Sequence, residues 1–145
     1  ISVLVLFGPL ADAAQIDGLR LRLSFEFCLF NVSNKIWLLW RSGFHFTVLH
    51  NSEQLLHVMM THDSWSSMGM ATFVYIKCTC TERRALWSDL VSIATTASCP
   101  WFVGGDFNGI YSVTEDVGRA VKDLGAIADF NEGIQSSSRL EVTFS

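Results

Sequence analysis

Short apolar runs alternate with polar turns along the chain, and the spacing of the apolar residues predicts both strands and helices. The apolar run at residues 1–7 predicts a buried strand, which Gly8-Pro9 ends. A helix is expected after Asp12, because apolar residues then recur at helical spacing. Segments 25–30, 35–40, 44–50 and 54–60 are β-prone or alternate with period two. Together these four segments predict a meander of antiparallel strands.

The second half of the chain continues with alternating strands and helices. Residues 70–78 predict a buried strand whose end lies at Tyr75 to Lys77. Residues 81–97 have a helical apolar period, with Thr81 as candidate N-cap and Glu82 in the first turn. A strand at 101–105, a Gly-rich charged loop, a helix near 126–138 and the fragment 140–145 follow. This interleaving predicts a layered α/β domain.

Composition narrows the class of protein. With 145 residues, half of them hydrophobic, the chain fits one globular domain and is too apolar to be disordered. The net charge is −4, so the chain lacks the excess of basic residues that is usual in proteins that bind nucleic acids. A polyanion would therefore have to bind to a local basic patch or through a metal ion. The four cysteines lack zinc-site spacing and favour free thiols in a reducing compartment. The tryptophans expected in the core are Trp37, Trp40, Trp87 and Trp101.

The apolar first residues fit neither a signal peptide nor a membrane span. A signal peptide needs a basic region and a cleavage site, and a span needs about 20 apolar residues. We therefore expect an intracellular protein of the nucleus or cytoplasm, neither secreted nor membrane-bound. The Asn31-Val32-Ser33 sequon would matter only in a secreted protein. An apolar run that starts at Ile1 further predicts that the sequence begins inside a domain.

The stretch "PWFVGGDFNGIYS" offers the main candidate chemistry, because Asp106 and Asn108 directly follow a buried strand. Residues i and i+2 of an extended segment point to the same side, so these two side chains can converge on one ligand. A carboxylate binds a hard cation, and a neutral amide can hold a phosphate oxygen or a water. The alternative is that both residues simply form a turn, which is common after strands.

The same stretch resembles the GGDFN segment of the endonuclease/exonuclease/phosphatase superfamily, and most closely the endonuclease-like region of plant non-LTR (LINE-type) retrotransposons. The resemblance extends over nearly the whole chain, through "NKIWLLW", "EQLLHV", "FVYIKCTCTERRALWSDL", "PWFVGGDFN" and "AIADFNEGI" in the family's order. It implies a four-layer αββα sandwich, here incomplete, and hydrolytic nicking of DNA with Mg²⁺ or Mn²⁺.

The resemblance also assigns roles to individual residues. Asp106 would lie beside the metal and orient the attacking water, Asn108 would bind the scissile phosphate or hold that water, and Tyr75 would face the phosphate. Phosphate contacts are expected from Lys77, Arg83 and Arg84, although such residues more often form a solvated face. A tyrosine at a strand end can equally be structural.

Departures from the family pattern predict impaired catalysis. The family's main magnesium ligand is a glutamate before a proline, and here Gly8 stands before Pro9, so the cation loses an anionic ligand. The family's first strand would lie upstream of Ile1, and its late aspartate-histidine pair beyond Ser145. Residues 1–145 are therefore expected to be the central part of such a domain, with unpaired strand edges and a tendency to self-associate.

Two further hypotheses stay open. The first is that the chain is a non-catalytic remnant or interaction module that keeps the fold. Gly8 and the excess of acidic over basic residues favour this hypothesis. The second is that the chain is a phosphatase of the same superfamily, because proteins with one fold can act on several kinds of substrate. Neither His57, expected in the core, nor the loop pair His62 and Asp63 completes a hydrolytic triad.

Overall fold

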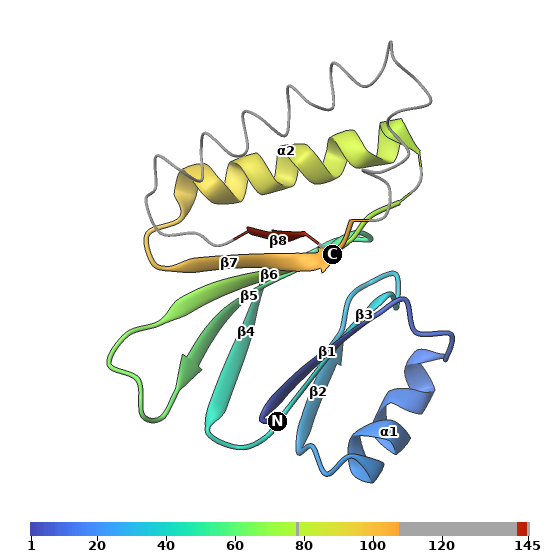
Figure 1. Cartoon of the computed structure of the whole chain (residues 1–145), viewed down its shortest axis with the longest axis vertical. Helices are drawn as coiled ribbons and strands as arrows, with labels where there is room; N and C mark the ends of the chain where they lie inside the picture. The colour runs from blue at the N-terminus through green and yellow to red at the C-terminus, as the bar shows by residue number, and fades with distance from the viewer. Residues whose placement is uncertain (78, 108–141, 145) are drawn as a thin grey trace.

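The computed structural model describes residues 1–77, 79–107 and 142–144, which form an α+β fold of two sheets and two α-helices (Figure 1). The smaller sheet contains β1 (Val3–Phe7), β2 (Phe27–Phe30) and β3 (Ile36–Trp40) in the order β1-β3-β2. Both of its pairings are antiparallel. The central strand β3 is buried at all five positions, which suits its run of large apolar residues.

The larger sheet follows the order β4-β5-β6-β7-β8. Its strands are β4 (Phe44–Asn51), β5 (Leu55–His62), β6 (Gly69–Tyr75), β7 (Trp101–Asp106) and β8 (Val142–Phe144). The first three strands pair antiparallel, whereas β6, β7 and β8 run parallel. Parallel neighbours need a long crossover, and the helix between β6 and β7 supplies it.

The single meander predicted for residues 25–60 is divided between the two sheets. β3 pairs with β1 and β2, while β4 begins the other sheet. The chain changes sheet at the turn before β4, where Gly43 has φ +101°, a backbone conformation that favours glycine. The prediction of one continuous meander was therefore wrong at this turn, because periodicity shows that a strand is present and not which strand it pairs with.

Two α-helices accompany the sheets. The first, α1 (Ile16–Arg22), follows a 3₁₀ turn, and the Gln15 side chain accepts a hydrogen bond from the Asp12 N–H at its start (3.0 Å). The second, α2 (Cys80–Thr96), is capped by Thr79 and not by Thr81 as predicted. Thr79 precedes Glu82 by three residues, which is the spacing of a capping box. Among the residues that the structure describes, no helix has the length and apolar character needed to span a bilayer.

Three clusters of buried side chains hold these layers together. One cluster joins α2 to one face of the larger sheet, and a second fills the space between the two sheets. The third packs Ile16 of α1 against Trp37 and Leu39 on the outer face of β3. All four tryptophans predicted as core are buried, which confirms that prediction: Trp37, Trp40, Trp87 and Trp101.

A buried asparagine ties the two sheets together at one end. Asn31, with 0% of its surface exposed, lies in the turn between β2 and β3. Its amide nitrogen donates to the backbone oxygens of Ser52 (3.0 Å) and Glu53 (3.2 Å), which lie in the turn between β4 and β5. Its oxygen accepts from the N–H groups of Lys35 and Ile36, both at 2.9 Å. Because this side chain is enclosed, the sequon at Asn31 is not accessible for glycosylation in the folded chain.

Candidate functional site

Two of the predicted site residues end neighbouring parallel strands. Tyr75 is the last residue of β6 and Asp106 the last of β7, and the two are register partners. The Ile76 N–H donates to the Asp106 carbonyl at 3.0 Å, so the pairing continues just beyond the strands. Register partners project from the same face of a sheet, so both side chains lie on one face at its carboxyl edge.

Gly8 lies against Tyr75 from the other sheet. It directly follows β1, has φ +63°, and its N–H donates to the Lys35 carbonyl at 2.7 Å. A Cβ atom on Gly8 would lie 3.0 Å from Cε2 and 3.2 Å from the hydroxyl oxygen of Tyr75. Residues far apart in sequence, Gly8, Tyr75 and Asp106, are therefore brought to one end of the interface between the two sheets.

The glycine pair of the GGDFN segment has a packing role. A Cβ atom on Gly105 would lie 2.0 Å from the Val74 carbonyl oxygen, a backbone atom that has no room to move aside. A Cβ atom on Gly104 would meet the ring of Phe102 at 2.6 Å. Gly105 thus lets β7 approach β6 closely enough to bring Asp106 beside Tyr75.

These residues do not make a complete ligand set for a divalent cation. A hard cation needs several oxygen ligands, and in this group of three Asp106 contributes the only carboxylate. Within residues 1–77, 79–107 and 142–144, no three His, Cys, Asp or Glu side chains are grouped so that they could hold a metal ion. Among these three residues the implied Mg²⁺ has Asp106 as its one carboxylate ligand, and Asn108, which is predicted to bind the phosphate, lies outside the described residues.

The predicted phosphate contacts differ in their surroundings. The Lys77 ammonium bonds to the carboxylates of Glu53 and Glu82, the latter at 3.1 Å, and these bonds raise the pKa of Lys77. The Thr79 hydroxyl, and then Lys77, lower the pKa of Glu82. Lys77 is thus neutralised by its own neighbours. Arg83 is buried, and Arg84 is exposed on α2.

The histidines form separate pairs and not a triad. His45 bonds to Asp63 at 2.7 Å, and His62 bonds to the hydroxyl of Ser64 at 2.7 Å. Asp63 therefore bonds to His45 and not to its sequence neighbour His62. His57 is buried with 5% of its surface exposed, as expected of a core histidine.

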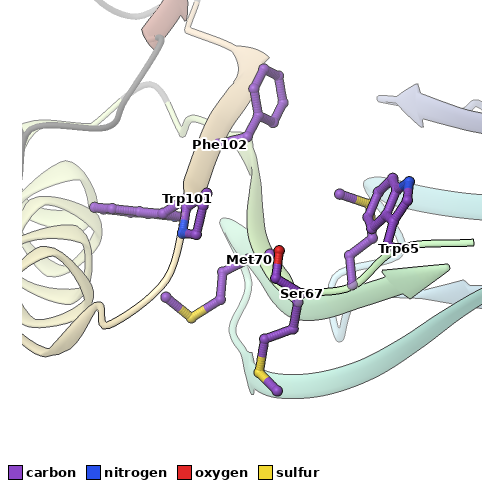
Figure 2. A pocket seen from close by; sticks show the side chains of 9 residues that line it. Trp65, Ser67, Met70, Trp101 and Phe102 are labelled. Atoms are coloured by element: carbon purple, nitrogen blue, oxygen red, sulfur yellow. The ribbon is translucent and has the colours of Figure 1, made fainter.

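An apolar cavity of about 380 Å³ lies at the opposite end of β6 and β7 from Tyr75 and Asp106. Figure 2 shows Trp65 and Phe102 apart from each other, and Trp101 directed away from both, toward α2. None of its lining residues carries an ionisable side chain. The lining consists of Met60, Trp65, Ser67, Met68, Gly69, Met70, Pro100, Trp101 and Phe102.

No protein-family model, curated protein or solved structure matches the chain. The interpretation of the site therefore depends on its own residues and on the motifs in the sequence.

Proposed function

We propose that the chain is a domain of the phosphodiesterase type, folded as a four-layer αββα sandwich of the endonuclease/exonuclease/phosphatase kind, whose hydrolytic site is impaired. The proposed ancestry is the endonuclease-like region of LINE-type retrotransposons, with DNA as the substrate class. One observation carries the proposal: the register pairing of Tyr75 with Asp106 beside Gly8. Three residues that the resemblance assigns to one site come from three separate segments and lie together.

The impairment follows from Gly8 and Asp106. Gly8 supplies no oxygen ligand from its side chain, and Asp106 alone is a weak site for a hard cation. Cation binding at this site is therefore expected to be weak. The two side chains can still orient a substrate. Asp106 can accept a hydrogen bond from a water or a hydroxyl group, and the Tyr75 hydroxyl can donate one to a phosphate oxygen.

A second candidate function is a non-catalytic module that keeps the fold. The pairing of Lys77 with Glu53 and Glu82 favours it, because this basic side chain is already neutralised at the end of β6. Because the net charge of the chain is −4, few basic side chains are then left to contact the phosphates of DNA. The two candidates differ in whether the chain binds DNA at all.

Nicking of supercoiled plasmid with Mg²⁺ or Mn²⁺ tests the impairment, with the Asp106→Ala variant as the matched control. We expect the unmodified chain to nick no faster than Asp106→Ala, with both shown to be folded by circular dichroism. Nicking by the unmodified chain that Asp106→Ala abolishes would overturn the proposed impairment. Gly8→Glu is not expected to restore activity, because φ is positive and the Tyr75 ring lies 3.0 Å from the new Cβ. The Gly8→Ala variant is the control for Gly8→Glu, because it introduces the same backbone strain without the carboxylate.

Binding of a fluorescent DNA duplex, followed by anisotropy, separates the two candidates. The phosphodiesterase-type domain is expected to bind the duplex weakly, with an affinity that falls as salt is added and falls further in Arg84→Ala. Ser88→Ala, also on the exposed side of α2, is the control and should leave binding unchanged. The absence of any salt-dependent binding by folded protein would favour the non-catalytic module.

A further inference from the structure

The apolar cavity at the start of β6 and β7, of about 380 Å³, is large enough to hold a small molecule. An apolar cavity of about 150 Å³ already admits benzene, and ligand sites in proteins commonly measure about 300 Å³ or more. The cavity lies at the opposite end of these strands from Tyr75 and Asp106, and neither residue lines it. A ligand bound here would therefore not contact the candidate site described above.

The lining residues determine which kind of ligand the cavity can accept. All of them are uncharged, and Ser67 contributes the one aliphatic hydroxyl among them. A charged ligand would lose its hydration without gaining an oppositely charged partner from the lining, which opposes its binding. Three of the four methionines in the chain line the cavity, Met60, Met68 and Met70. Because thioethers adapt their shape and make favourable contacts with aromatic rings, the lining favours a neutral aromatic ligand.

Two aromatic rings line the cavity from different elements. Trp65 belongs to the loop between β5 and β6, and Phe102 belongs to β7. The two rings lie apart from each other (Figure 2), and the two residues are 44% and 41% exposed. Aromatic rings attract each other by more than the area that they bury. An aromatic ligand can therefore gain such contacts in this cavity, whereas an aliphatic ligand of the same size cannot.

Contacts within the protein hold both rings in place. The Trp65 ring lies 5.6 Å from the Phe44 ring, at 90° to it, and 5.8 Å from the His62 ring. The Trp65 N–H donates to the His62 carbonyl at 2.9 Å. The Phe102 ring lies over Gly104, where a Cβ atom would meet it at 2.6 Å. Because both rings are positioned by the fold, little of their freedom is lost when a ligand binds.

We propose that this cavity binds a small neutral aromatic molecule of about two fused rings, which packs against Trp65, Phe102 and the methionine side chains. A hydroxyl group on the ligand can exchange a hydrogen bond with the Ser67 hydroxyl. The site is independent of the proposed phosphodiesterase function, because it uses other residues at the other end of the strands.

Three probes of similar size separate the parts of this proposal: 2-naphthol, decahydro-2-naphthol and naphthalene-2-sulfonate. In NMR titrations of the full chain near neutral pH, we expect 2-naphthol to bind about fivefold more tightly than its saturated analogue, which lacks the aromatic contacts. It should bind at least about tenfold more tightly than the sulfonate, whose charge has no partner in the lining. No binding of 2-naphthol, or equal affinity for 2-naphthol and either analogue, would overturn the proposal.

The Phe102→Leu variant is the test of the site, and Phe30→Leu is its control. Both replace a phenylalanine on a strand, with 41% and 42% of the residue exposed, but only Phe102 lines the cavity. We expect Phe102→Leu to bind 2-naphthol about threefold more weakly than the unmodified chain, because one aromatic contact is lost. Phe30→Leu should bind it with unchanged affinity. Equal affinities of the two variants would overturn the assignment of the ligand to this cavity.

A second measurement needs no variant. In protein with ¹³C-labelled methionine methyl groups, we expect nuclear Overhauser contacts between 2-naphthol and the methyl groups of Met60 and Met68. Met59, the fourth methionine of the chain, does not line the cavity and is the internal control. Contacts to Met59 alone, or to no methionine, would likewise overturn the assignment.

Discussion

The strand-end site at Tyr75 and Asp106 and the buried His57 with its hydrogen-bond partners lie on opposite faces of one sheet, and they are built in different ways. The first depends on backbone geometry: Gly105 lets two strands come close, and the strand ends bring Asp106 to the edge. The second depends on side chains from three strands, because hydrogen bonds join Trp101 to Thr72 and Thr72 to His57. The strand-end site has a recognisable motif and few ligand groups. The hydrogen-bonded group at His57 has no motif, but its polar atoms are paired with one another.

The largest expected effect comes from closing the backbone contact at the strand-end site. Gly105→Ala puts a Cβ atom 2.0 Å from the Val74 carbonyl oxygen, so the strands must separate. We expect a loss of about 3 kcal/mol or more in the free energy of unfolding, measured by urea denaturation. The control is Gly18→Ala, where nothing lies within 4 Å of the new Cβ. That change should stabilise α1 by about 0.5–1 kcal/mol. Equal stability of the two variants would contradict the packing role of Gly105.

A smaller effect is expected from interrupting the hydrogen bonds between Trp101, Thr72 and His57. Thr72→Val keeps the shape of the side chain but leaves Trp101 Nε1–H and Nδ1 of His57 without the hydroxyl that joins them. We expect this to lower the free energy of unfolding by about 1–3 kcal/mol in urea denaturation. Thr47→Val, at an exposed position of β4, should change it by less than about 0.5 kcal/mol. A Thr72→Val chain as stable as the Thr47→Val chain would show that the hydroxyl does not link the two rings.

The smallest expected effect is a dependence of stability on pH. Because burial lowers the pKa of His57 in the folded chain, the unfolded chain binds more protons once the pH falls below the ordinary histidine value of about 6.5. Stability from this group is complete above that value and is lost as the pH falls toward the lowered pKa. We expect urea midpoints to fall between about pH 7.5 and about pH 5.5, and to fall less in His57→Gln than in His45→Gln. Identical slopes in the two variants would show that His57 is not the group responsible.

The same contrast explains how much could be predicted from sequence. The strands were predicted to within a few residues, and α2 and the strand-end motif were located, because each depends on the local order of apolar residues, glycines and caps. The N-cap was assigned to Thr81, although Thr79 has the capping-box spacing to Glu82. The neutralisation of Lys77 by Glu53 was not predicted, because Glu53 lies in the distant turn between β4 and β5.

The surroundings of His57 and His50 could not be predicted at all. His50, His57 and Asp89 come from three elements, and no spacing in the sequence relates a β4–β5 register to one turn of α2. The weak clue was the pair His50 and His57 across a short turn, since both residues of a hairpin pair face the same side. A register assignment would have been needed to use it. Side-chain constellations that cross elements are set by tertiary packing, which local patterns do not encode.

Asn31 has a consequence for how the molecule opens. Its side chain clamps the backbone of two turns that belong to different sheets, and it also bonds the amide hydrogens of Lys35 and Ile36. Neither turn can detach without leaving buried donors and acceptors unsatisfied, so local fraying at this end is suppressed. The two sheets are thereby coupled into one cooperative folding unit, and the amides of Lys35 and Ile36 exchange with solvent only when that whole unit opens.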